Sequence, residues 1–120
     1  MNETEAINLA EKPWLITDAL QCNEVVGFLN AKVTDLDMAT RELELAADIF
    51  HVNLLREEGK SIALKEAEWK ISEPYKAWRD SQVLLRKFRA LRKHLREKEE
   101  DYRSSSRFVR DNYQNYPRAI

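Results

Sequence analysis

Residues 15–54, LITDALQCNEVVGFLNAKVTDLDMATRELELAADIFHVNL, are the stretch that decides the fold. Apolar or small residues recur along it at alternating spacings of four and three, which is the heptad pattern of a coiled-coil helix. Pro13 fits the first turn of such a helix, where its missing N–H would be unpaired anyway. We predict a helix over residues 13–57. The repeating positions are Leu15, Ala19, Cys22, Val26, Leu29, Val33, Leu36, Thr40, Leu43, Ala47, Phe50 and Leu54.

A second helical run follows over residues 61–103. Gly59 is expected to end the first helix in the left-handed conformation, and Ser61 to cap the next one. Pro74, preceded by Ser72, either starts a new helix or kinks a continuous one. The repeating positions of this run are Leu64, Ala67, Ile71, Trp78, Ser81, Leu85, Phe88 and Leu95.

Folding back at Gly59 places positions whose numbers sum to roughly 118 opposite one another, so that Leu54 meets Leu64 and Thr40 meets Trp78. We therefore predict an all-α fold: an antiparallel helical hairpin, or coiled coil, hinged at Gly59. Residues 1–12 form an arm or short helix, 13–103 the hairpin, and 104–120 an Arg/aromatic tail. The large apolar residues off the seam predict self-association into a helical bundle, a homo-oligomer, or binding of a different protein. They are Trp14, Trp69, Val83, Leu84 and Leu91.

The composition excludes other classes of fold. The chain of 120 residues has only 2 Gly and 3 Pro, whereas sandwiches and barrels need turn residues every roughly 8–12 positions. Charged residues make up 34% of the chain and hydrophobic residues 43%, and these proportions are typical of amphipathic helices. A single cysteine, Cys22, indicates no disulfide framework, and the N-terminal residues resemble no signal peptide. We expect a cytoplasmic protein that does not interact with membranes.

Catalytic and metal-binding patterns are weak. Gly59, Lys60 and Ser61 resemble the end of a phosphate-binding loop, but Leu54 stands where that motif needs a glycine. The histidines His51 and His94 lack ligands at metal spacing, and Cys22 lies on the apolar stripe. We expect no enzyme activity, no catalytic residues, no metal and no cofactor.

Charge is distributed unevenly. Residues 1–75 hold 7 basic and 15 acidic residues, whereas residues 76–120 hold 13 basic and 6 acidic ones. The basic run of residues 86–96 predicts either nucleic-acid binding without base specificity or pairing with acids of the first helix, such as Asp35 and Asp37. The candidate nucleic-acid-binding residues are Arg86, Arg89, Arg92, Lys93, Arg96, Arg107 and Arg110. Candidate partner-binding residues also include Phe108, Tyr113 and Tyr116, where aromatics interleave with arginines.

The segment of residues 60–103, KSIALKEAEWKISEPYKAWRDSQVLLRKFRALRKHLREKEEDYR, resembles small helical-hairpin accessory proteins of tailed bacteriophages. The likeness lies in an Ala-rich part, then Ser72 to Tyr75 with Trp78, then a Leu/Arg helix. It implies a small protein that acts on host machinery or on replicating DNA, in the host cytoplasm.

Three functions follow as hypotheses. The first is a non-enzymatic interaction protein that binds a host, replication or recombination protein through its apolar face and tail. The second is sequence-nonspecific binding of nucleic acid by residues 86–96. The third is an acidic face that mimics nucleic acid and inhibits a host protein, formed by Asp35, Asp37, Glu42, Glu44 and Asp48.

Overall fold

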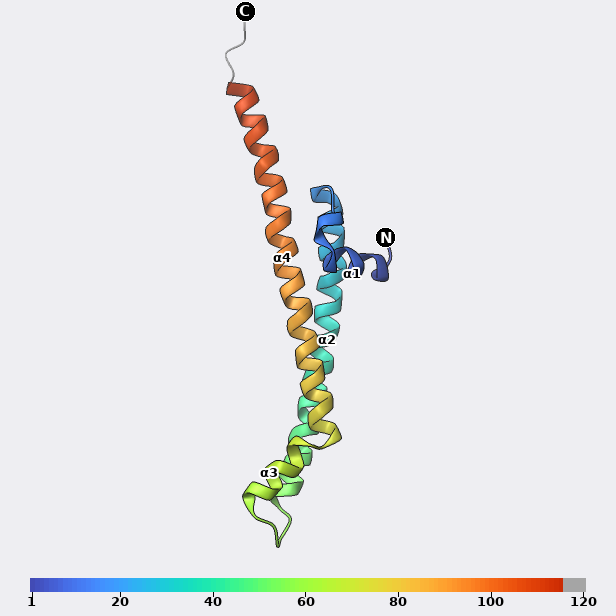
Figure 1. Cartoon of the computed structure of the whole chain (residues 1–120), viewed down its shortest axis with the longest axis vertical. Helices are drawn as coiled ribbons and strands as arrows, with labels where there is room; N and C mark the ends of the chain where they lie inside the picture. The colour runs from blue at the N-terminus through green and yellow to red at the C-terminus, as the bar shows by residue number, and fades with distance from the viewer. Residues whose placement is uncertain (116–120) are drawn as a thin grey trace, which may run out of the picture. The chain divides into compact units, whose positions relative to one another are not determined.

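The computed structural model describes the backbone of residues 1–115 and the side chains of residues 1–104. It contains four α-helices and a short 3₁₀ helix, and no strand occurs within residues 1–115, so the all-α prediction is confirmed (Figure 1). The helices are α1 (Glu3–Glu11), α2 (Ala19–Leu55), α3 (Ile62–Lys70) and α4 (Glu73–Asn115), with η1 (Pro13–Leu15) between α1 and α2.

The chain divides into two compact units, and α2 and α4 contribute to both. Unit 1 comprises Met1–Asn30 and Ala90–Ile120, and unit 2 comprises Ala31–Arg89. Each unit has its own buried positions and its own polar contacts, so each is described by itself.

The N-terminal arm of unit 1 is a helix with a defined beginning and end. The side chain of Asn2 accepts a hydrogen bond from the Glu5 backbone N–H at 2.8 Å, which caps α1. Proline disfavours helical geometry in the residue before it, and Lys12 accordingly leaves the helix before Pro13. The arm packs through small residues, because Ala6 and Ala10, one turn apart, are its buried positions.

The prediction that the long helix begins at Pro13 is wrong, because α2 begins at Ala19. Asp18 Oδ1 accepts a hydrogen bond from the Gln21 N–H at 2.7 Å, and Gln21 Oε1 accepts one from the Thr17 N–H at 3.0 Å. Reciprocal bonds of this kind satisfy the backbone donors at a helix start. Pro13 opens η1 instead.

Unit 1 has fully buried apolar residues on both α2 and α4. Cys22 and Leu95 are 0% exposed and Leu29 is 1% exposed, and these residues come from α2 and α4. A hydrogen bond from the Tyr102 hydroxyl to the Ile16 carbonyl at 2.9 Å also joins α4 to the segment before α2. In unit 1, the parts of α2 and α4 therefore share buried apolar residues, and a polar contact joins α4 to the segment before α2.

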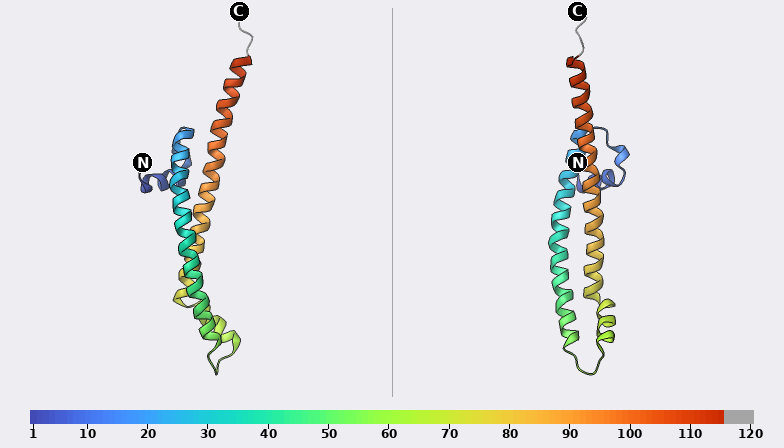
Figure 2. Two further views of the ribbon diagram at one scale, coloured as in Figure 1. Left: turned by 180° about the vertical axis from the view of Figure 1, so that it is seen from behind. Right: turned by 90° about the vertical axis from the view of Figure 1, so that its left-hand side faces the viewer.

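Unit 2 buries one heptad position of α2. Val33, Thr40, Ala47 and Leu54, each seven residues apart, are its buried residues on that helix. Leu85, among others, is buried on α4. Figure 2 shows the unit 2 part of α2 beside α3 and the start of α4.

The residues that face α2 in unit 2 differ from those predicted. Thr40 shares a hydrogen bond of 2.6 Å with Ser81, three residues beyond the predicted Trp78. Leu64, predicted to meet Leu54, is 48% exposed, whereas the neighbouring Lys65 is buried. Nearer the loop, the contact between His51 of α2 and Glu66 of α3 agrees with the predicted fold-back, because these numbers sum to 117.

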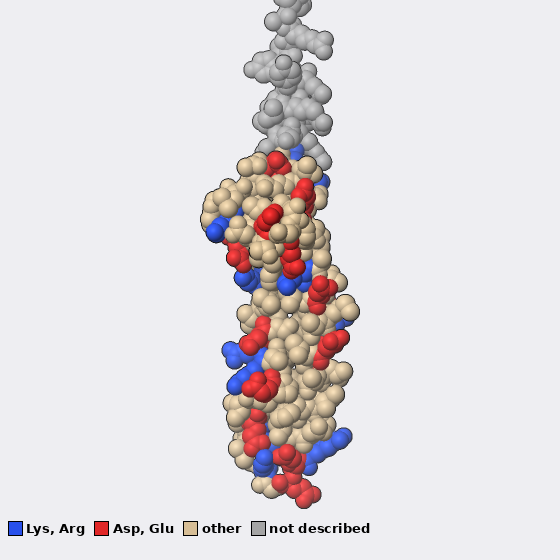
Figure 3. All heavy atoms as spheres, turned by 90° about the vertical axis from the view of Figure 1, so that its right-hand side faces the viewer, with Lys and Arg blue, Asp and Glu red and all other residues tan. Residues whose placement is uncertain are grey.

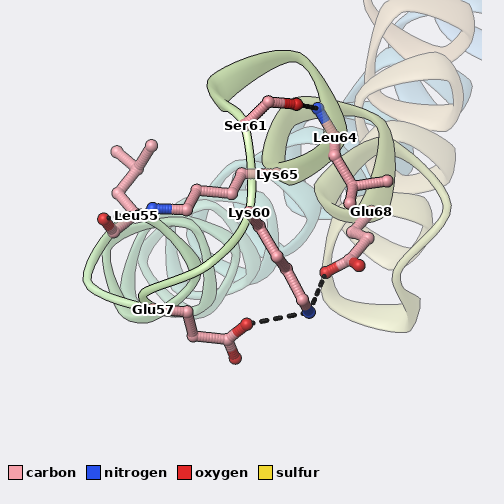
Figure 4. A network of polar contacts seen from close by, with 7 residues as sticks. All are labelled: Leu55, Glu57, Lys60, Ser61, Leu64, Lys65 and Glu68. Atoms are coloured by element: carbon pink, nitrogen blue, oxygen red, sulfur yellow. Dashed lines mark hydrogen bonds and ion pairs between the residues drawn. The ribbon is translucent and has the colours of Figure 1, made fainter.

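The loop between α2 and α3 is held by lysines (Figure 4). Gly59 has a φ of 84°, a left-handed conformation that favours glycine. Lys60 bridges Glu57 at 2.9 Å and Glu68 at 3.0 Å, and these two carboxylates raise the pKa of its ammonium group. Lys65 donates to the Leu55 carbonyl at 3.0 Å, which satisfies an orphan acceptor at the end of α2.

The chain leaves helical structure between α3 and α4, ahead of Pro74. The Ser72 hydroxyl donates to the Trp69 carbonyl at 2.6 Å and accepts from the Tyr75 N–H at 3.4 Å. α4 then begins at Glu73, so Pro74 occupies its first turn, where a proline is tolerated.

The second helical run was predicted to end at residue 103, before a tail. That helix end is wrong, because α4 continues to Asn115. Serine lowers helix stability only modestly relative to alanine, and the chain has no Gly or Pro between residue 104 and Pro117. The serine run is therefore compatible with a continuing helix.

Candidate interaction surface

A line of exposed apolar side chains runs along α2 in unit 2. Met38 and Leu45 are each 61% exposed, Ile49 is 54% exposed and Val52 is 44% exposed. Their spacings of seven, four and three place them on one side of a helix. We call this set the outer face of α2.

The outer face lies on the opposite side of α2 from the buried positions. Leu45 precedes the fully buried Ala47 by two residues, and two residues turn an α-helix by about 200°. Both sides of this part of α2 are consequently apolar. A helix that packs against one neighbour needs only one such side.

Acidic residues border the outer face. Glu42 and Asp48 are exposed, and neither makes a hydrogen bond or ion pair with any residue whose side chain the structure describes. Arg41 is also exposed on this side of the chain and pairs with Asp37 of the same helix at 3.2 Å. Carboxylates thus outnumber cations beside the apolar line. Figure 3 shows how acidic and basic side chains border uncharged surface on one face of the molecule.

The residues predicted to bind a partner lie in different environments. Trp14 is 71% exposed in η1 of unit 1, and Leu84 is 40% exposed on α4 in unit 2. Leu91, on α4 in unit 1, is half-buried. Trp14 and Leu84 therefore remain available to a partner, whereas Leu91 is partly covered.

Trp69 does not belong to the exposed apolar set, which corrects the expectation from its off-seam position. Its indole N–H donates to the Ala47 carbonyl at 3.0 Å. Its ring stacks on His51 with centroids 3.9 Å apart, and His51 Nε2 contacts the Glu66 carboxylate. Tyr75 meets the same indole edge-on at 4.8 Å. These contacts join α2, α3 and α4 within unit 2.

Part of the predicted basic stripe is engaged within the chain. In unit 2, Arg89 pairs with Asp37 at 3.1 Å. In unit 1, the Asn30 side chain accepts hydrogen bonds from Arg92 at 3.5 Å and from Arg96 at 3.0 Å. These pairs agree with the alternative in which the basic run meets the first long helix.

Two other cations of that run are not engaged in this way. Arg86 and Lys93 are exposed and make no ion pair or hydrogen bond with the side chains described, residues 1–104. The side chains of the remaining predicted residues lie outside the described part of the chain. These are Arg107, Phe108, Arg110, Tyr113 and Tyr116.

The titratable groups form no metal or nucleophilic centre among the described residues. No cluster of three or more His, Cys, Asp or Glu side chains is found there. Cys22 is buried, its thiol donates to the Leu95 carbonyl at 3.1 Å, and burial followed by the charge of Glu99 raises the pKa of this thiol. A protonated, buried thiol is a poor nucleophile. Within the described helices, none is both long and apolar enough to cross a membrane.

The sequence carried a signal for the outer face of α2 that the heptad reading missed. Met38, Leu45, Ile49 and Val52 form a second apolar series, offset from the seam that Thr40 and its equivalents define. The heptad positions alone place these four residues in neither the predicted core nor the predicted binding surface. The comparisons with known proteins add no assignment, since no protein-family model, curated protein or solved structure matches the chain.

Proposed function

We propose that the chain is a non-enzymatic helical interaction protein that binds another protein chain through the outer face of α2. The observation that supports the proposal is an exposed line of four large apolar side chains opposite a buried line on the same helix. Contiguous exposed apolar surface with a polar rim is typical of protein interaction sites. The class of partner, a host or phage protein of replication or recombination, rests on the resemblance of residues 60–103 alone.

The proposal includes an antiparallel hairpin hinged at Gly59. Its support within unit 2 is the order of the contacts, since Asp37, Thr40 and His51 of α2 meet Arg89, Ser81 and Glu66 respectively. Within unit 1, Cys22 and Asn23 of α2 meet Leu95 and Glu99 of α4. A helical hairpin offers a partner the outer sides of both helices.

The proposal is tested with a double variant, Leu45→Glu with Ile49→Glu, and a matched control, Ile62→Glu. Ile62 is 73% exposed on α3, so its substitution adds a charge to the same unit away from α2. Each protein is immobilised, and proteins captured from a bacterial lysate are quantified by mass spectrometry, with helicity checked by circular dichroism. We expect wild type and the control to enrich the same proteins, and the double variant to lose them. Equal capture by all three, in a chain that also stays monomeric in sedimentation, would refute the proposal.

Nucleic-acid binding is a second candidate, favoured by the unengaged Arg86 and Lys93. If these two cations neutralise phosphates, the affinity for duplex DNA falls with salt at a log–log slope near −1.8, because each phosphate contributes about −0.9. Fluorescence anisotropy from 50 to 200 mM salt measures this slope. A steeper slope, near −3.6, would mean that Arg89 and Arg96 exchange their internal partners for phosphates.

Mimicry of nucleic acid by acids of α2 is a third candidate with less support. Of its five carboxylates, Asp37 is neutralised by Arg41 and Arg89. The others are Asp35, Glu42, Glu44 and Asp48.

A further inference from the structure

We infer that the outer face of α2 is covered by the same face of a second copy of this chain, running in the opposite direction. This inference rests on the proposed function and names its partner. A two-fold axis that crosses the interface requires a surface that is complementary to itself when reversed. The outer face of α2 meets this requirement in its apolar residues and in its charges.

Three of the four outer-face residues, Met38, Leu45 and Val52, are symmetric about Leu45, whereas Ile49 lies opposite Arg41 of the second copy. With a two-fold axis near this residue, positions whose numbers sum to about 90 lie opposite one another. Leu45 then packs against Leu45 of the second copy, and Met38 packs against Val52 of the second copy. All three are exposed in the single chain, at 61%, 61% and 44%. Pairing the faces would bury each of them.

The charged residues on one border are also complementary. In an antiparallel pair, each border of the face meets the same border of the other helix. Arg41 and Asp48 occupy the same border, and the register places Arg41 opposite Asp48 of the second copy, twice by symmetry. The Arg41 side chain is 77% exposed, and Asp48 has no partner among the described side chains, so both groups are accessible.

On the other border, the carboxylates of one copy lie opposite small or neutral residues of the second copy. This arrangement avoids repulsion between carboxylates there. Glu42 lies opposite Ala46 of the second copy, and Asp35 lies opposite Asn53 of the second copy. Neither Asp35 nor Glu42 therefore faces a carboxylate, whereas Glu44, between Arg41 and Asp48 on the first border, lies near Glu44 of the second copy. Alanine at position 46 also permits close approach of the two helices, as small residues do at helix interfaces.

The test uses single cysteines on the outer face in the full chain. We expect Leu45→Cys to form a disulfide-linked dimer on mild oxidation, and a mixture of Met38→Cys and Val52→Cys to form a linked heterodimer. Ile62→Cys is the matched control, since Ile62 is also exposed, at 73%, on α3, and we expect it to remain unlinked. The native Cys22 does not interfere because it is fully buried.

Charge exchange gives a second measurement of the same register. Arg41→Asp and Asp48→Arg each place like charges opposite one another, and we expect each to weaken the dimer several-fold in sedimentation. The double variant restores both ion pairs and regains the affinity. Linking of Ile62→Cys as efficient as that of Leu45→Cys, or no rescue by the double variant, would overturn this interface.

The outcomes also separate this inference from the proposed function. A chain that sediments as a monomer while lysate capture still depends on Leu45 and Ile49 would overturn the second copy as occupant. The proposed function would stand in that case. Loss of both the dimer and the capture difference would overturn both proposals.

Discussion

Unit 1 and unit 2 differ in how far they bury their large apolar residues. Within residues 1–104, the largest fully buried side chains, Leu29, Leu95, Val25 and Cys22, all belong to unit 1. Of the 15 large apolar residues that are exposed in the same part of the chain, 11 belong to unit 2. Similar helical sequence patterns therefore give a closed core in one unit and an incompletely covered one in the other.

The difference follows from what each unit has to pack against α2. Unit 1 contains α1 as well as part of α4, and its Val25 is fully buried although it lies off the predicted seam. Figures 1 and 2 show α1 beside the first part of α2. In unit 2, α3 and α4 cover one side of α2, and the outer face stays exposed. The uncovered side is where we propose that a partner binds.

Truncation of a core leucine should give the largest effect and the sharpest contrast between the units. We expect Leu95→Ala to lower the free energy of unfolding by about 2–5 kcal/mol, because it leaves a cavity at a fully buried site. Leu45→Ala, at a position 61% exposed, should change it by less than about 0.5 kcal/mol. Urea denaturation at low protein concentration measures both. Equal losses would mean that the outer face is covered within the chain.

The polar pair in the seam of unit 2 should give the next largest effect. Thr40→Val leaves the Ser81 hydroxyl without its partner, and we expect a loss of about 1 kcal/mol. Replacing both residues, Thr40→Val with Ser81→Ala, removes the unsatisfied group and should cost less than the two single losses together. A double-mutant cycle from urea midpoints measures the coupling. Strict additivity would contradict the contact.

Substitution of the α2 cap, Asp18, tests where this helix begins within unit 1. Asp18→Ala removes the acceptor for the Gln21 N–H, and we expect a loss of about 0.5–2 kcal/mol. Asp35→Ala is the matched control, since Asp35 is an exposed aspartate within the same helix. The thermal midpoints of the two variants provide the comparison. An equal shift in both would place the helix start elsewhere.

The buried thiol of unit 1 should give a small, pH-dependent effect. The pKa of Cys22 is raised above the ordinary thiol value of 9.0, so above pH 9.0 the unfolded chain loses this proton before the folded chain does. The free energy of unfolding should therefore fall as pH rises above 9.0, relative to Cys22→Ala. Urea titrations of the two proteins at pH 8 and pH 10 provide the measurement. Parallel pH profiles would contradict the raised pKa.

The sequence predicted the helical class because the heptad spacing extends through residues 15–54 and the chain has few Gly and Pro. It predicted Ser61 as a cap, and the Ser61 side chain does accept from the Leu64 N–H at 3.2 Å. The start of α2 was missed because Pro13 matches a helix start as well as Asp18 does. The distinguishing feature is Gln21, three residues after Asp18.

The candidate surface was less accessible to sequence reasoning. A leucine at a heptad position and a leucine on the opposite side of the helix contribute alike to hydrophobic content, and only packing distinguishes them. Trp69 illustrates this: it lies off the predicted seam, yet its indole N–H donates to the Ala47 carbonyl within unit 2.

Sedimentation equilibrium of the full chain from 1 to 100 μM tests most directly whether the outer face of α2 in unit 2 binds a second copy of the chain. Wild type and Ile62→Glu should show a concentration-dependent rise in mass to that of two chains. The double variant with Leu45→Glu and Ile49→Glu should remain a monomer of 14.2 kDa at every concentration, with unchanged helicity. A wild-type chain that stays monomeric at 100 μM would contradict the account, as would a double variant that still forms dimers.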